Sequence, residues 1–381
     1  MIRVGFDAKR FFWNFTGLGN HSRSLIRGLA RHESSRVEIN LFTPKINLAV
    51  LAEDSMRDRY QVVSPKHRFA RLAWREWRVA DAIRARDLHV YHGLSAELPL
   101  GVEKLGVLPV VTIHDLVAEM RPELFGAVDA RIYRWKMRSA VKRAGLVLAT
   151  SEATKQEVLE VYCKSPEQVH VLYQSPAEGF LRVPDSAQDL QTRARLGLPR
   201  EYLLSVGSVI ERKRLRATLR ALAHPRLRVL APRLVVVGSR RSEYAALAQR
   251  DVRELGLESQ VIWLSDLSAQ DLPAVTRGAM VSVYPSIYEG FGIPLAEAMI
   301  SRVPVLTSKV SCLPEVAGPG GVCVNPDDPE EFAVGLASLL EDQTLRERLA
   351  HQGYAHAANR YLPAPLATRL INLYREFLGQ G

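Results

Sequence analysis

Two glutamates flank a glycine-rich segment of this sequence that is suited to bind an anion. Segment 285–299, PSIYEGFGIPLAEAM, leads from an apolar stretch through a glycine-rich turn to a proline at the expected start of a helix. Backbone amides at such a helix start can bind a phosphate. Glu289 and Glu297 only accept hydrogen bonds when ionised, so they suit the hydroxyls of a sugar and a ribose. The alternative is a solvent-facing acidic helix start.

A pair of cations follows another apolar stretch. Segment 205–215, SVGSVIERKRL, places Arg212 and Lys213 shortly after Gly207. A guanidinium fork and an ammonium can together neutralise a leaving diphosphate without a metal ion. The sequence also lacks an Asp-x-Asp pair and a His/Cys cluster, so no metal site is expected. The alternative is a solvated run of charges at a helix start.

The first half of the chain offers two further candidate sites. His114 and Asp115 follow an apolar run, where His can donate to a sugar hydroxyl or phosphate and Asp can orient it or accept from an acceptor substrate. A histidine with a purely structural hydrogen bond is the alternative. Segment 15–25, FTGLGNHSRSL, holds Gly17 and Gly19 but matches neither GxGxxG nor a P-loop. These glycines either let the backbone approach a ligand or form a plain turn.

Apolar runs alternate with helix-length segments along the whole chain, which predicts an α/β fold. Six runs lie in the first half, at 2–8, 37–43, 88–93, 108–115, 146–151 and 169–173. Six more lie in the second half, at 202–207, 233–238, 261–265, 279–286, 303–308 and 321–326. Each set indicates a Rossmann-like doubly wound domain with buried parallel strands. Ligands bind such sheets beyond the carboxyl ends of the strands, where the four candidate segments lie.

A polar stretch with two prolines, from about Gly179 to Arg200, marks the link between the halves. We therefore expect an N-terminal domain over 1–185 and a C-terminal domain over 186–362. The tail, 363–381, has apolar residues at helical spacing and is expected to form a closing amphipathic helix that packs back on the first domain.

Composition favours a folded protein of the reducing cytoplasm. Of the 381 residues, 47% are hydrophobic, and the three cysteines lack CxxC spacing. The sequence has neither a signal-peptide core nor an apolar run long enough to span a membrane. The net charge of +10 lies mostly in residues 1–185. Segment 67–86 combines aromatic and basic residues at helical spacing, which suits an anionic membrane surface or, alternatively, an ordinary core-packing helix.

The combination of these motifs resembles glycosyltransferase family 4, whose members have the GT-B fold of two Rossmann-like domains facing a central cleft and act with retention of configuration. The matching segments are TGLGNHSR, TIHDL, RIYRWKMRSAVKRAGLVLATSEATKQEV, the VG...ERKR turn and EGFGIPLAE. The basic turn reads RKR here, with Arg214 last, where many relatives have RKN.

The resemblance also implies roles for individual residues. Arg212 and Lys213 would bind the donor diphosphate, Glu289 the transferred sugar, Glu297 the ribose, and His114 would position the sugar. The remaining donor contacts would come from the amides of Gly290, Phe291 and Gly292, from Ile293, and from Trp263 and Leu264 near the base.

The expected activity is transfer of a mannose-, rhamnose- or glucose-like hexose from a nucleoside diphosphate sugar. No further cofactor is expected. The acceptor would be a glycan or a lipid-linked glycan in bacterial surface polysaccharide or lipopolysaccharide synthesis, at the inner face of the plasma membrane. Two alternatives remain at this point. One is a sugar-nucleotide epimerase on the same fold, and the other is a basic nucleic-acid-binding protein suggested by the sequence pI near 9.6.

Overall fold

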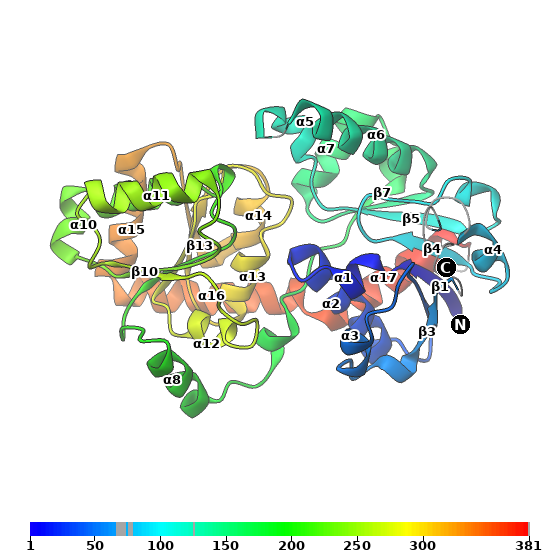
Figure 1. The fold of residues 1–381 in the computed structure, drawn as a ribbon, viewed down its shortest axis with the longest axis horizontal. Helices are drawn as coiled ribbons and strands as arrows, with labels where there is room; N and C mark the ends of the chain where they lie inside the picture. Colours follow the sequence, from blue (N-terminus) through cyan, green and yellow to red (C-terminus); the bar gives the residue numbers. More distant parts are fainter. Residues whose placement is uncertain (66–73, 75–78, 125, 380–381) are drawn as a thin grey trace. The chain divides into compact units, whose positions relative to one another are not determined.

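The computed structural model describes residues 1–65, 74, 79–124 and 126–379. The chain divides into two compact units. Unit 1 consists of Met1–Ser175 and Tyr361–Gly381, and unit 2 consists of Pro176–Arg360. Each unit is an α/β domain built on its own parallel sheet (Figure 1).

Unit 1 contains a seven-stranded sheet in the order β3-β2-β1-β4-β5-β6-β7, in which every neighbouring pair is parallel. Its strands are β1 (Ile2–Asp7), β2 (Val37–Phe42), β3 (Tyr60–Val63), β4 (Val90–Gly93), β5 (Leu108–Ile113), β6 (Leu146–Ala149) and β7 (Val169–Val171). Six of the seven coincide with predicted runs. The edge strand β3 was not predicted, because YQVV is short and only half buried.

Helices cover both faces of this sheet because its strands are apolar on both sides. Val110 and Leu146 belong to one core cluster, whereas their chain neighbours Val111 and Val147 belong to a second cluster on the opposite face. The helices are α1 (Lys9–Trp13), α2 (Gly17–His32), α3 (Leu48–Ala52), α4 (Val79–Arg84), α5 (Val117–Met120), α6 (Ala127–Arg143), α7 (Glu152–Tyr162) and α17 (Pro363–Phe377).

The C-terminal helix α17 packs against α2, with its apolar stripe buried in the first core cluster of unit 1. Gly28 of α2 allows the close approach, since a Cβ there would lie 3.3 Å from the Cβ of Pro363. The Tyr374 hydroxyl lies 2.7 Å from Nδ1 of buried His92 on β4. The last helix of the chain therefore completes the domain that the first strands begin.

Unit 2 contains a six-stranded parallel sheet in the order β10-β9-β8-β11-β12-β13. Its strands are β8 (Leu203–Val206), β9 (Leu234–Val237), β10 (Val261–Leu264), β11 (Val281–Tyr284), β12 (Val305–Ser308) and β13 (Gly321–Val324), and each coincides with a predicted run. This is the doubly wound order in which the direction of winding reverses between two central strands, here β8 and β11. A ligand of such a sheet binds beyond the carboxyl ends of those two strands.

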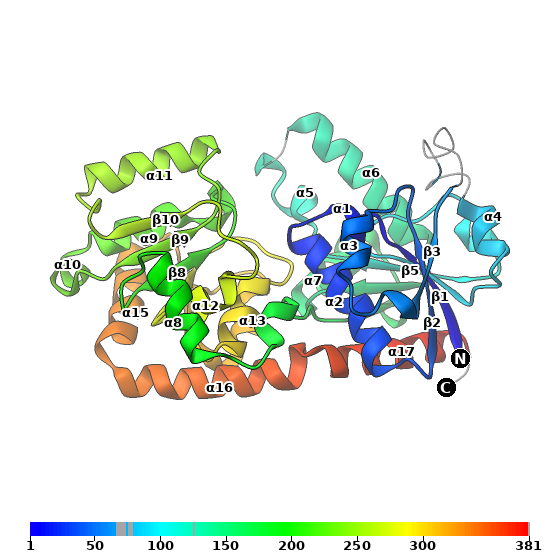
Figure 2. The same cartoon turned by 60° about the horizontal axis from the view of Figure 1, so that its bottom comes forward.

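The helices of unit 2 lie on both sides of its sheet, with α11 and α13 on opposite sides (Figure 2). They are α8 (Ser186–Arg195), α9 (Leu215–Leu222), α10 (Pro225–Leu230), α11 (Glu243–Glu254), α12 (Leu272–Arg277), α13 (Ile293–Ile300), α14 (Leu313–Ala317), α15 (Pro329–Glu341) and α16 (Gln343–Tyr361). Apolar residues of α9, α11 and α15 form one core cluster with the strands.

The division at Ser175 and Pro176 comes ten residues before the boundary expected at residue 185. The polar stretch from about Gly179 to Arg200 thus lies inside unit 2, and it begins within a short 3-10 helix, η7 (Glu178–Leu181). Most of segment 67–86, suggested above as a membrane contact, lies outside the described residues. Within the described part of the chain, no helix has the length and apolar character needed to cross a membrane.

Candidate functional site

The turn after β8 places two cations at the winding reversal of unit 2. Gly207 directly follows β8 and has a φ of 139°, a conformation that glycine adopts without strain. The short 3-10 helix η8 (Glu211–Lys213) then carries Arg212 and Lys213. Arg214 ends it in the left-handed conformation at a φ of 52°, which asparagine tolerates better than arginine. Arg214 is held there by Glu211 and Asp327.

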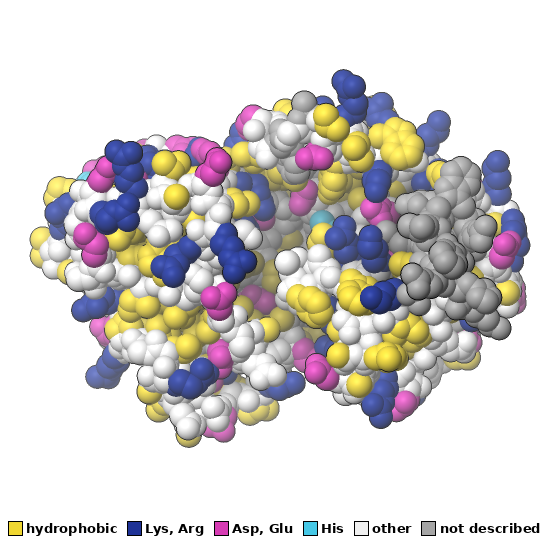
Figure 3. All heavy atoms as spheres, viewed as in Figure 1, with side chains coloured by type: hydrophobic (Ala, Val, Ile, Leu, Met, Phe, Trp, Pro, Cys, Tyr) yellow, Lys and Arg dark blue, Asp and Glu magenta, His cyan; other side chains and the backbone are white. Residues whose placement is uncertain are grey.

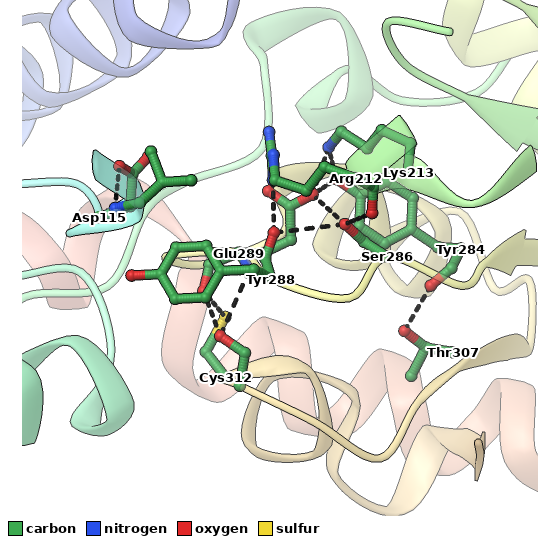
Figure 4. Close-up of polar contacts among 11 residues, drawn as sticks. Asp115, Arg212, Lys213, Tyr284, Ser286, Tyr288, Glu289, Thr307 and Cys312 are labelled. Carbon is green, nitrogen blue, oxygen red and sulfur yellow. Dashed lines mark hydrogen bonds and ion pairs between the residues drawn. The ribbon is translucent and has the colours of Figure 1, made fainter. Parts of the chain in front are cut away.

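The segment after β11 brings Glu289 to these cations. Arg212 Nη1 lies 2.6 Å and Lys213 Nζ 2.5 Å from the same carboxylate oxygen, Oε1. The hydroxyls of Ser286 and Tyr284 donate to that oxygen at 2.7 and 3.0 Å (Figure 4). Four donors from the ends of two adjacent strands thus converge on one oxygen of a largely buried carboxylate.

The charges of this cluster determine its protonation. Burial alone raises the pKa of Glu289, but Lys213 and Arg212 outweigh burial and lower that pKa to about 2. Burial is also the largest influence on Lys213, whose pKa it lowers against the raising effect of Glu289. Because the carboxylate is ionised at neutral pH, it can accept a hydrogen bond from a hydroxyl of a ligand.

The backbone around Glu289 is held by the next strand–helix turn. The hydroxyl of Ser311 and the thiol of Cys312 donate to the Glu289 carbonyl at 2.7 and 3.1 Å. Ile287 N donates to the Arg212 carbonyl of η8, and the Ser286 hydroxyl that donates to Glu289 Oε1 lies 3.0 Å from the same carbonyl. The acidic and the basic segments are therefore fixed to each other through both side chains and backbone.

Helix α13 begins directly beyond this cluster. Gly292 precedes the helix with a φ of 93°, and Pro294 stands in the first turn. A Cβ at Gly292 would lie 3.1 Å from Leu313 Cδ2, so both its conformation and its space favour glycine. Gly290 and Phe291 are buried in the turn, and Ile293 begins the helix.

Glu297 lies one turn into α13 and is buried. Its Oε1 accepts from the backbone amide of Ala177 at 3.3 Å. Burial raises the pKa of Glu297 to about 7, although the Ala177 hydrogen bond lowers it in part. The pKa values of Glu289 and Glu297 therefore differ widely, because only Glu289 lies next to cations.

His114 follows β5 in unit 1, and both of its ring nitrogens are bound by the protein. Nε2 lies 2.8 Å from the Leu94 carbonyl, and Nδ1 lies 2.8 Å from the side-chain nitrogen of Gln174. Burial lowers the pKa of His114 to about 4, so the ring is neutral at pH 7. A carbonyl only accepts, so Nε2 carries the proton and Nδ1 accepts from Gln174.

The other candidates of unit 1 lie near the amino ends of helices. Asp115 Oδ1 accepts from Val117 N at 3.2 Å, and Asp115 lines a pocket together with His114 and residues of α6. Gly17 and Gly19 do not form a loop but the first turn of α2. A Cβ at Gly19 would lie 1.7 Å from the Asn14 carbonyl oxygen, so glycine is needed there for a contact within unit 1.

Trp263 and Leu264 lie within β10 rather than after it, and Trp263 packs against the core of unit 2. Their contact with a base stays a prediction. Sequence reasoning did not assign roles to Tyr284, Ser286 or Gln174. The first two stand next to Glu289 in the sequence, where a signal was available, whereas Gln174 lies far from His114 along the chain.

Comparisons with known proteins match both halves of the chain. The family model described as "Glycosyltransferase Family 4" matches residues 15–174, and the model "Glycosyl transferases group 1" matches residues 188–356. The chain belongs to glycosyltransferase family 4. The epimerase and nucleic-acid-binding alternatives receive no support from these matches.

Individual relatives of this family 4 glycosyltransferase are similar along its whole length. O-antigen chain mannosyltransferase B of Escherichia coli is 26% identical over 98% of this chain and 100% of its own. Anabaena HepE, solved with UDP and glucose, superposes with a TM-score of 0.73 at 18% identity, covering 99% of this chain and 100% of its own. WaaG, a glycosyltransferase involved in lipopolysaccharide biosynthesis, has a TM-score of 0.70 at 21% identity, covering 98% and 99%. These structures share the fold.

Proposed function

We propose that this glycosyltransferase moves a mannose-, rhamnose- or glucose-like hexose from a nucleoside diphosphate sugar to a glycan or lipid-linked acceptor. The proposed reaction retains the anomeric configuration and needs no metal ion. The relatives support this assignment, since one is an O-antigen mannosyltransferase, one was solved with UDP and glucose, and one takes part in lipopolysaccharide biosynthesis. We place the reaction in the cytoplasm, at the inner face of the plasma membrane.

The observation that carries the proposal is the convergence of Arg212, Lys213 and Glu289 beyond the ends of β8 and β11. Two cations against one carboxylate leave one net positive charge in a largely buried site. A diphosphate that enters can bind the cations, which frees Glu289 to accept from hydroxyls of the transferred sugar.

The rest of unit 2 offers a cradle for the same donor. Amides of Gly290, Phe291 and Gly292 and the start of α13 at Ile293 would bind phosphate or sugar oxygens. The carboxylate of Glu297, one turn further, would accept from ribose hydroxyls. Gly207, Trp263 and Leu264 lie at or near the ends of β8 and β10, where the diphosphate and the base are proposed to rest.

The acceptor is proposed to bind unit 1, where His114 and Asp115 line a pocket. The bond between the anomeric carbon and the β-phosphate oxygen breaks while the acceptor oxygen bonds to the same face of that carbon. The acceptor proton passes to the departing phosphate oxygen. Because both ring nitrogens of His114 are already bound, a sugar contact requires displacement of Gln174 or of the Leu94 carbonyl.

Metal independence is proposed because protein cations can take over the neutralising role of a metal ion. As the diphosphate departs, its negative charge grows next to Arg212 and Lys213, which need little reorganisation because the Tyr288 carbonyl holds Arg212 and the Tyr284 hydroxyl holds Lys213. Activity in the presence of a strong chelator tests this point. Loss of activity that returns with added divalent cation would contradict it.

The first experiment is calorimetric titration with UDP, GDP, dTDP and ADP in metal-free buffer. We expect one nucleotide to bind selectively and Arg212→Ala to weaken it at least about tenfold. Arg226→Ala is the matched control, since Arg226 pairs with Glu341 on the surface of unit 2. Product analysis with the matching nucleotide sugar then gives the anomeric configuration. Folded protein that binds none of the four nucleotides would overturn the proposal.

A further inference from the structure

Helix α6 of unit 1 exposes an apolar stripe to solvent. Val128, Ile132 and Trp135 are 73%, 51% and 64% exposed. Their spacing of four and three residues keeps them within about 60° of the helix circumference at roughly 100° per residue. The opposite face of α6 is buried at Ala130 and packs against the core through Met137 and Ala140–Val141. The exposed stripe is therefore a second apolar face and not part of the helix's packing.

Basic residues border this stripe on both sides. Over its 17 residues α6 carries six basic side chains against one acidic side chain, Asp129. At helical spacing, Arg131, Arg138 and Lys142 fall along one side of the stripe and Lys136 falls along the other, where the half-buried Arg143 instead donates to the carbonyls of Leu98 and Pro99. Figure 3 shows hydrophobic and basic side chains next to one another over the segment labelled α6 in Figure 1.

We propose that this face of α6 docks the enzyme on an anionic lipid bilayer. A helix with apolar side chains centred between rows of cations lies in the membrane interface with the stripe in the acyl boundary and the cations on lipid phosphates. Tryptophan favours this interface because its ring is apolar and its N–H is polar. A protein partner would need an acidic complement, whereas an anionic bilayer supplies negative charge at every point of contact.

The docking face also adjoins the pocket of His114 and Asp115. Ile132 belongs to the exposed stripe and Lys136 to one basic row, and both line that pocket. A bilayer held against α6 would therefore lie next to the pocket in which a lipid-linked acceptor is proposed to react. This consequence rests on the proposed function, but the docking itself does not.

Vesicle co-sedimentation of the full chain, without nucleotide or acceptor, tests the docking. We expect the protein to bind vesicles that contain phosphatidylglycerol, and to bind phosphatidylcholine vesicles at least about tenfold more weakly. Ile132→Ser with Trp135→Ser should abolish binding to both, and Arg138→Gln with Lys142→Gln should remove the preference for the anionic lipid. Val229→Ser is the matched control, because Val229 is 86% exposed on α10 of unit 2.

A fluorescence measurement separates docking from damage to the fold. Trp135→Leu keeps the apolar stripe, so this variant should still bind anionic vesicles but lose the blue shift and the quenching by brominated lipid that Trp135 provides. The thermal unfolding midpoint checks that each variant is folded, since α6 lies in unit 1, and nucleotide binding by unit 2 tests the proposed function separately. Folded wild-type protein that does not bind anionic vesicles, or stripe variants that bind them as well as the wild type does, would overturn the docking proposal. A stripe-dependent dimer without vesicle binding would do the same.

Discussion

Arg212 and Glu289 form a largely buried ion pair, with 2.6 Å between Nη1 and Oε1, although they are contributed by turns after two different strands. Lys213 reaches the same oxygen at 2.5 Å. The carboxylate is paired with both cations before any ligand binds, so a diphosphate has to compete with it for them. The pairing also stabilises the folded protein, because two adjacent cations without a counter-charge would be unfavourable in a largely buried site.

Glu289→Gln should separate nucleotide binding from catalysis. The amide keeps the shape of the side chain but no longer neutralises Arg212 and Lys213, so the nucleoside diphosphate should bind equally well or more tightly. Turnover should fall by about 10²-fold or more, because the sugar loses a charged acceptor. Calorimetry and product formation measure the two effects. Glu341→Gln, on the surface of unit 2, serves as the control. Weaker nucleotide binding by Glu289→Gln would contradict the competition between Glu289 and the diphosphate for the two cations.

Stability should depend on pH through Glu297. Its pKa is about 7 in the folded protein against 4.5 for a free side chain, so between these values the folded state retains a proton that the unfolded chain has released. The free energy of unfolding therefore falls as pH rises through this window, by up to about 3 kcal/mol. Urea titrations at both ends of the window measure it. Glu297→Gln should remove this component, and an unchanged pH profile in the variant would contradict the assignment.

Gln174 should set the tautomer of His114. Gln174→Glu places a carboxylate beside Nδ1, which should draw a proton to that nitrogen and raise the pKa of His114 above about 4. Nitrogen NMR of the ring reports the change directly. Transfer activity should acquire a new pH dependence in the same range. The control is Gln168→Glu, which alters a half-buried glutamine elsewhere in unit 1; equal spectra for wild type and Gln174→Glu would count against the interaction.

Gly292→Ala should destabilise the folded protein by more than the cost of a left-handed conformation alone. The conformation accounts for about 1–2 kcal/mol, and the Cβ would additionally press on Leu313 at the start of α14. Gly197→Ala has a positive φ of 64°, against 93° at Gly292, and open space around it, so it gives the cost of a left-handed conformation without a clash. Denaturation midpoints compare the two variants. Equal losses would show that Leu313 yields without cost, and Gly292→Ala should also weaken nucleotide binding.

Much of the architecture follows from local sequence pattern. The strands of unit 2 are apolar runs bounded by turns, so all six could be predicted, and Glu289, Arg212 and Lys213 could be placed at strand ends. Strand β3 escaped prediction because YQVV at a sheet edge is half exposed and lacks a continuous apolar signal. Gly17 and Gly19 suggested a loop, yet they open α2, since a helix start tolerates glycine and Asn14 needs the close approach.

The sequence by itself determined the two parallel sheets, the family and the identity of the charged residues near the strand ends, because buried strands and glycine turns leave short-range patterns. Only the tertiary structure decided that two cations share one oxygen of Glu289, that Glu297 keeps a proton near neutrality, and that Gln174 fixes His114. Those properties depend on burial and on side chains brought together from distant segments. Desolvation and distances of a few ångströms, which no linear spacing encodes, determine them.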